Sequence, residues 1–186
     1  MSVTTTDLPV RYDRLTMALH WLTAALVIGL FACAQIWEQL PKGTPLRKEL
    51  QALHISCGIL LAVIVVTRVL WRLFKGRRLP PANQGALNIL AKTAHLALYA
   101  LLLSQIVLGF FLRWAQAEPF NFFGLFEVPT LIAFDKSMKS VFGGLHEQVA
   151  WAIIILASLH AIVALVHHYG LRDNTLRRML PGRVSN

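Results

Sequence analysis

The sequence predicts an all-α integral membrane protein built as a four-helix bundle. Of its 186 residues, 56% are hydrophobic and only 15% are charged, whereas soluble domains carry about 25% charged residues. Four apolar stretches approach or exceed the roughly 20 residues that a helix needs to cross a bilayer. They lie at about 15–37, 52–73, 94–111 and 145–169, without an internal repeat or a linker between them. Residues 1–186 are therefore expected to form a single membrane domain.

The distribution of basic residues predicts the orientation of the bundle. Twelve Lys and Arg residues lie in the N-terminal arm, the second connection and the C-terminal tail, against six in the first and third connections. The positive-inside rule then places both termini in the cytoplasm. The net charge of +9 does not indicate nucleic-acid binding, because the basic residues flank apolar runs instead of forming one stripe. Anionic lipid headgroups explain the positive excess better.

The third connection, residues 113–144, is long for a helix bundle, rich in aromatic residues and interrupted by Pro119 and Pro129. Such a segment either packs as a lid over the outer face or lies in the headgroup region without a role. The two cysteines, Cys33 and Cys57, both lie within apolar runs. They are expected to be free, buried, small hydrophobic residues.

Histidines inside the predicted spans indicate a function, because an ionisable side chain in a bilayer is costly. His146 and His160 are fourteen residues apart on the fourth span. This is just under four helical turns, so both side chains point to nearly the same face, about 21 Å apart along the axis. One helix therefore offers a ligand near each membrane surface.

Depth along the helices predicts the partner of each of these ligands. His54, near the outer start of the second span, matches the height of His146. His20 lies about 27 Å below the outer end of the first span, and the depths of His160 and His167 in the fourth are about 24 and 34 Å. His160 therefore fits His20, whereas His167 reaches into the headgroups.

Two imidazoles at one level suit haem better than a bare metal ion. A protein metal site needs three or four converging ligands, whereas haem iron already has four porphyrin nitrogens and needs only axial ligands. The alternative is interior histidines hydrogen-bonded between helices. Two more residues on the His54 face support haem: Gly58, which lets a flat macrocycle approach the backbone, and Arg68, which lies at the inner level and can pair with propionates. Their alternative roles are helix packing for Gly58 and snorkelling for Arg68.

The chain resembles the bacterial cytochrome b561 family, which includes hydrogenase cytochrome b subunits. The matching segments are RYDRLTMALHWL, LHISCGILLAVIVVTRVLWRL, SMKSVFGGLHE and SLHAIVALVHHYGLRDNTLRRMLP. The last of these resembles the superoxide oxidase subgroup, superoxide:ubiquinone oxidoreductases. The resemblance implies a multi-pass protein of the bacterial inner membrane with two b haems. Their axial ligands would be His20 with His160 and His54 with His146, in agreement with the depths. It also implies superoxide as electron donor and ubiquinone as acceptor.

Three further histidines, His95, His167 and His168, are candidates for the quinone site, because quinone reduction needs hydrogen-bond donors and protons. Their alternative role is to anchor helix ends at the interface. Lys136 and Lys139, shortly before His146, are candidates for steering the superoxide anion, or else ordinary lysines that contact headgroups.

Two rival functions stay open at this point. The chain could be the electron-transfer subunit that relays electrons between a hydrogenase or dehydrogenase and the quinone pool. It has almost no extension for docking, so an obligate protein partner is not indicated. A metal-ion transporter would need polar groups continuous through the bilayer, and none bridges the two histidine levels.

Overall fold

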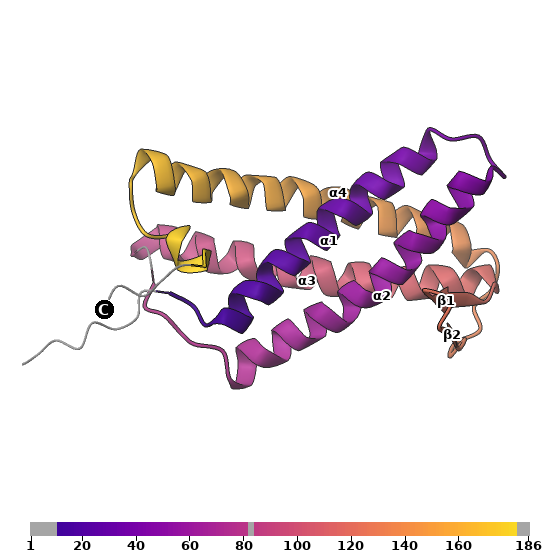
Figure 1. Cartoon of the computed structure of the whole chain (residues 1–186), viewed down its shortest axis with the longest axis horizontal. Coiled ribbons are helices and arrows are strands. Elements are labelled where there is room, and N and C mark those ends of the chain that lie inside the picture. Colours follow the sequence, from indigo (N-terminus) through magenta and orange to yellow (C-terminus); the bar gives the residue numbers. More distant parts are fainter. Residues whose placement is uncertain (1–10, 82–83, 182–186) are drawn as a thin grey trace, which may run out of the picture.

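The computed structural model describes residues 11–81 and 84–181, which form mostly helical structure. Its four long helices are α1 (Arg14–Glu38), α2 (Pro45–Phe74), α3 (Gly85–Gln116) and α4 (Met138–Leu165) (Figure 1). Each is long and apolar enough to cross a membrane. The first three expected spans lie inside α1, α2 and α3, whereas the fourth, 145–169, runs past the end of α4 at Leu165. The largest difference is α3, which extends several residues beyond 94–111 at both ends.

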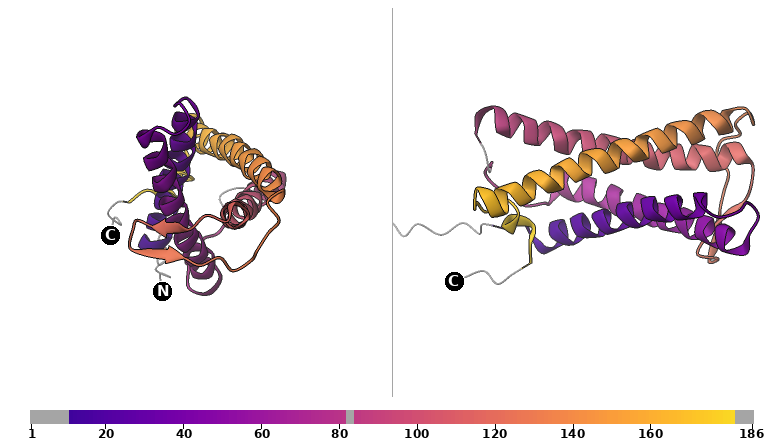
Figure 2. Two further views of the ribbon diagram at one scale, coloured as in Figure 1. Left: turned by 90° about the vertical axis from the view of Figure 1, so that its right-hand side faces the viewer. Right: turned by 90° about the horizontal axis from the view of Figure 1, so that it is seen from above.

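The helices pack as two consecutive pairs, α1 with α2 and α3 with α4. The view along the bundle in Figure 2 (left) shows one pair on each side of the axis. The pairs meet through an apolar cluster of buried side chains from three helices, namely Leu61 and Val65 of α2, Leu102 of α3 and Ile153 of α4. Val65 is completely buried, so the bundle is closed at its middle.

The first connection, the third connection and the start of α4 meet at one end of the bundle, called here the hairpin end. The third connection contains two short antiparallel strands, β1 (Phe120–Phe122) and β2 (Phe126–Val128). The turn between them has positive φ angles at Phe123 and Gly124, which the tight reversal requires. The expectation of an all-α chain is therefore corrected at this hairpin.

The hairpin is fastened to α2 by a single hydroxyl group. Ser56, which is 4% exposed, donates to the backbone carbonyl of Asn121 at 3.2 Å and accepts from the backbone N–H of Phe123 at 3.0 Å. Phe120 is also buried, with 4% of its surface exposed. This part of the third connection thus packs against the bundle.

The opposite end, called here the terminal end, holds the start of α1, the end of α2 and the C-terminal segment. Asp13 caps α1 by accepting from the backbone N–H of Thr16 at 2.9 Å, and it also accepts from the indole N–H of Trp71 at 3.0 Å. The backbone N–H of Tyr12 donates to the carbonyl of Arg178 at 3.1 Å. These bonds tie three segments that are far apart in the sequence.

After α4 the chain continues through a π-helical turn, η1 (Val166–Gly170), and a short 3-10 turn, η2 (Arg177–Met179). The backbone then returns toward α1, where the indole N–H of Trp21 donates to the carbonyl of Met179 at 2.8 Å. The ends of the described chain therefore lie together (Figure 1).

Candidate functional site: two histidine pairs between the helix pairs

Four histidines face each other in two pairs across the gap between the helix pairs. The ring centres of His54 on α2 and His146 on α4 are 6.4 Å apart, with an interplanar angle of 70°. Those of His20 on α1 and His160 on α4 are 6.5 Å apart, at 76°. The structure thus brings His20 together with His160, the histidine that the depth comparison favoured.

These separations match two imidazoles that share one metal ion. Two metal–nitrogen bonds of about 2 Å, with about 1 Å more from each nitrogen to its ring centre, place the centres about 6 Å apart. Direct packing of the rings would bring them closer, as between His95 and His160, whose centres are 5.1 Å apart. Both pairs therefore leave room for an ion between their nitrogens.

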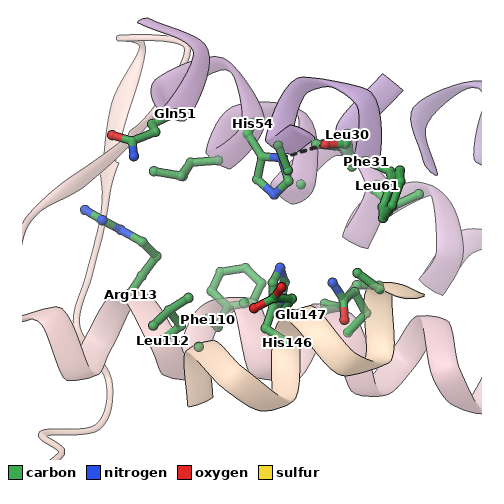
Figure 3. A pocket seen from close by; sticks show the side chains of 18 of the residues that line it. Leu30, Phe31, Gln51, His54, Leu61, Phe110, Leu112, Arg113, His146 and Glu147 are labelled. Carbon is green, nitrogen blue, oxygen red and sulfur yellow. Dashed lines mark hydrogen bonds between the residues drawn. The ribbon is translucent and has the colours of Figure 1, made fainter. Parts of the chain in front are cut away.

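The His54–His146 pair lies in a cavity of about 690 Å³ at the hairpin end, within the range of small-molecule and cofactor sites. Figure 3 shows the two imidazoles approaching from opposite walls, with open space between them. Gly58 lines this cavity, and a Cβ atom added to it would meet nothing within 4 Å. The absent side chain thus leaves open space beside His54.

A backbone carbonyl sets the tautomer of His54. Its Nδ1–H donates to the carbonyl oxygen of Leu30 on α1 at 3.1 Å (Figure 3), and a carbonyl can only accept. The proton therefore resides on Nδ1, so the lone pair of Nε2 is free to bind a metal. Trp37 packs its edge against the same ring, with centres 4.8 Å apart. The orientation of this ring is thus set by two contacts from α1.

The ring of His146 is positioned by a residue that sequence reasoning missed. A Cβ atom added to Gly109 of α3 would lie 3.3 Å from Cε1 of His146. Glycine therefore lets the ring lie close against the α3 backbone. Gly109 offered no signal of its own in the sequence, because only the packing of α3 on α4 places it there.

The His20–His160 pair is surrounded by further polar groups. Arg68 of α2 donates to Nδ1 of His20 at 2.9 Å, and its guanidinium lies over the ring of Tyr99, 5.1 Å from the centre. His95 packs against His160 from α3. Arg68 and His95 thus meet at the inner pair, as their positions in the sequence suggested, and Tyr99 is an additional member of the cluster.

An apolar layer separates the two histidine pairs. Ile153 lies seven residues from both His146 and His160, and Leu61 lies seven residues from both His54 and Arg68. Both residues belong to the buried central cluster. The two pairs are thus distinct sites at different depths of one bundle.

A family model described as prokaryotic cytochrome b561 matches residues 11–182. The chain belongs to this family. It is 36% identical to cytochrome b561 homolog 2 of Escherichia coli K12, over 94% of each chain. It is 28% identical to a protein of Yersinia pestis named probable superoxide oxidase CybB, over 92% of this chain and 96% of that one. A third relative, cytochrome b561 homolog 1 of E. coli K12, is 29% identical over 93% of this chain and 98% of that one.

Membership in the cytochrome b561 family implies a multi-pass bacterial membrane protein that binds b-type haem and transfers electrons. The residues of this cytochrome fit that group. Among residues 11–81 and 84–181, no three His, Cys, Asp or Glu side chains cluster as ligands of a bare metal ion. Haem iron already has four porphyrin nitrogens as ligands and needs only two more, which a pair of imidazoles can supply. The hollow beside Gly58 and the fixed tautomer of His54 suit the same group.

The other quinone candidates of this cytochrome lie near the end of α4. His167 is 8% exposed, and its Nδ1–H donates to the carboxylate of Asp173. His168 packs beside the neighbouring ring of Tyr169, with centres 4.8 Å apart. His95, in contrast, contacts His160.

Of the two lysines considered for anion steering, Lys139 lines the His54–His146 cavity and Lys136 lies outside its wall. Arg113, which sequence analysis counted only as a loop charge, also lines this cavity. Its guanidinium is 3.6 Å from the carboxylate of Glu118 and extends from α3 toward Gln51 of α2 (Figure 3). Arg113 is thus a second cation of the cavity wall.

Proposed function

We propose that this cytochrome is a superoxide:ubiquinone oxidoreductase that holds two b haems. The observation that carries the proposal is the presence of two histidine pairs with ring centres 6.4 and 6.5 Å apart. Their residues on α4 are fourteen positions apart, about 21 Å along the helix. Two sites so spaced span most of the hydrocarbon thickness of a bilayer, about 30 Å.

His54 with His146, and His20 with His160, would each hold one b haem. A haem held by two imidazoles would supply reversible one-electron transfer. The chain supplies the ligands, fixes the His54 tautomer through Leu30 and keeps the two sites apart by its apolar layer.

The partner of Arg68 at the His20–His160 pair depends on whether a haem occupies that site. It now donates to Nδ1 of His20, but a neutral imidazole that binds a metal through Nε2 keeps its proton on Nδ1 and cannot accept there. Arg68 would therefore lose this acceptor if Nε2 of His20 held a metal. Its guanidinium, which lies over Tyr99 in this structure, could then pair with a carboxylate such as a propionate.

The excess of Lys and Arg in the N-terminal arm, the second connection and the C-terminal tail, twelve against six, supports a cytoplasmic terminal end and a hairpin end on the outer side of the inner membrane. The outer cavity then faces the side from which superoxide arrives. Lys139 and Arg113 share its wall with Glu38, Glu118 and Glu147, so attraction of a small anion would rest on the local field near Lys139. The similarity to the probable superoxide oxidase supports this donor.

Reduction of ubiquinone to the quinol consumes two protons, and the terminal end carries groups that can supply them. His167 holds a proton on Nδ1 against Asp173, and the side chain of Asp173 is 34% exposed. His95 and His168 are the other candidates beside the inner site. We assign His167 as the main proton donor, because it alone has a charged partner that reaches the surface.

The test uses the purified protein with its native haem content. A pyridine haemochrome assay is expected to give two haems per chain, and a superoxide-generating system is expected to reduce them. Added ubiquinone should then reoxidise them. If dithionite reduces the haems but superoxide does not, the proposal fails and the relay subunit of a hydrogenase or dehydrogenase takes its place.

A further inference from the structure

A second cavity, of about 500 Å³, lies at the hairpin end between α2 and the β-hairpin. It is distinct from the space between the histidines, although Gln51, Ile55, Arg113, Glu118 and Phe120 line both. The Ser56 hydroxyl, bound to Asn121 and Phe123, closes its back. None of the functions assigned above uses this cavity.

The lining of this cavity is divided by chemistry. Lys48 and Arg113 supply positive charge, and Leu53, Ile55 and Phe123 supply apolar surface. Arg113 is engaged by Glu118 at 3.6 Å, whereas Lys48, in the first turn of α2, has no ion pair among the described residues. The positive end of the helix dipole adds to the charge of Lys48. The cavity therefore suits an anion that carries an apolar chain.

The apolar wall continues on the surface of the molecule. Leu53 is 47% exposed and Phe123 is 48% exposed, and beyond them Leu125 and Phe126 of the hairpin are 75% and 55% exposed. Aromatic and aliphatic side chains at the end of a membrane bundle belong at the level of the lipid headgroups and upper acyl chains. The hairpin thus exposes apolar side chains beside the cavity.

We propose that this cavity binds the phosphate headgroup of an anionic phospholipid, with Lys48 as its main cation. A free phosphate ion would find only one cation without a counterion, which makes a weak site in water. A phospholipid adds burial of its acyl chains against Leu53 and Phe123. Arg113 and Phe120 line both cavities. A lipid bound here would therefore contact part of the wall of the His54–His146 cavity.

The test compares lipid binding to delipidated holoprotein by native mass spectrometry. The probes are phosphatidylglycerol, phosphatidylcholine of the same acyl chains, and inorganic phosphate as competitor. Wild type is expected to retain phosphatidylglycerol in preference to phosphatidylcholine. Lys48→Gln should weaken phosphatidylglycerol binding about fivefold, the effect of one cation near a lipid surface. Lys48→Arg should restore binding.

The matched control is Lys42→Gln, which removes an exposed lysine from the connection just before α2 and outside the cavity. An equal loss in Lys42→Gln and Lys48→Gln would overturn the proposal in favour of general surface charge. Equal retention of the two lipids by wild type would also overturn it. Displacement of phosphatidylglycerol by millimolar inorganic phosphate would show a free-anion site instead. An unchanged haem spectrum confirms that each variant is folded.

Discussion

Each of the four facing histidines has a different neighbour beside its ring. His54 is oriented by the Leu30 carbonyl, and His146 lies against the bare backbone of Gly109. His20 contacts Arg68, and His160 contacts His95. Such second contacts fix ring orientation and tautomer, and they influence metal affinity nearly as much as the ligands do.

Replacement of His54 or His146 by Ala is expected to remove one haem and spare the other, because the two pairs are separated by the apolar layer. The pyridine haemochrome assay should fall from about two haems per chain to about one. His95→Ala is the matched control, because His95 contacts His160 but belongs to neither pair. This variant should retain both haems. Retention of two haems in either ligand variant would refute the assignment.

Gly58→Leu is expected to lower haem occupancy of the outer site without destabilising the helix. The space beside Gly58 is open, and Leu favours helix over Gly by roughly 1 kcal/mol. Gly29→Leu on α1, which also meets nothing within 4 Å, gains the same propensity away from the cavity. Haem content and helical circular dichroism are measured together. Full haem content in Gly58→Leu would show that the macrocycle does not use this space.

Among the elements, the junction of α1 with α2 at the terminal end depends on one carboxylate. Asp13 accepts four hydrogen bonds, from the backbone and hydroxyl of Thr16, the indole of Trp71 and the backbone of Arg77. Burial opposes ionisation, but these bonds outweigh it and lower the pKa of Asp13 to about 2. Asp13 thus stabilises the folded state only while it is charged.

Because the folded pKa is depressed, this stabilisation is complete above the ordinary value of 3.8 and is lost as the pH falls toward 2. Asp13→Asn is therefore expected to lower the unfolding temperature at pH 7 and to match wild type near pH 2. Circular dichroism measures the unfolding temperatures of wild type and Asp13→Asn between pH 7 and pH 2. Glu127→Gln, in the exposed strand β2, is the control. A difference that persists unchanged at pH 2 would contradict the role of the charge.

The π-helical turn after α4 places His167 against Asp173, and this pair belongs to the C-terminal element. Burial opposes ionisation of Asp173, but hydrogen bonds from His167 and Thr175 lower its pKa to about 2. The carboxylate is therefore charged at neutral pH. The carboxylate accepts from Nδ1 of His167 and so orients the imidazole ring.

His167→Gln is expected to leave both haems in place and to slow their reoxidation by ubiquinone by about 100-fold, the lower end of the range for loss of a general acid. Asp173→Asn should slow it less, because the imidazole remains. Stopped-flow reoxidation and haem content are measured for both. Loss of a haem in His167→Gln, with both retained in His160→Ala, would exchange the ligand roles of these two histidines.

At the scale of the whole molecule, charge and apolarity are arranged along the bundle axis. Basic residues dominate the terminal end, and the central cluster of Leu61, Val65, Leu102 and Ile153 separates the two sites. The hairpin end combines the larger cavity with the cations Lys139 and Arg113 in its wall. This arrangement suits electron transfer from one face to the other, with ions kept out of the middle.

Lys139→Gln is expected to slow haem reduction by superoxide about tenfold at low ionic strength, with the difference narrowing as salt screens the charge. Lys136→Gln, three residues earlier and outside the cavity wall, is the matched control and should have a smaller effect. Stopped-flow reduction at several salt concentrations measures both. Focused steering by Lys139 would be excluded if both substitutions slowed reduction equally, or if neither slowed it.

The sequence alone determined the four helices and the heights of the histidines, because hydrophobic length and helical periodicity are local properties of the chain. It thereby predicted that His20 would meet His160 and not His167. Only the tertiary structure decided which backbone groups contact the rings, since nothing about the residue types at Leu30 and Gly109 indicates that role. The same holds for Arg113 and the Ser56-bound hairpin, whose positions depend on the packing of α2 against α3 and the third connection. Contacts between helices arise from residues far apart in the chain, and no local period encodes them.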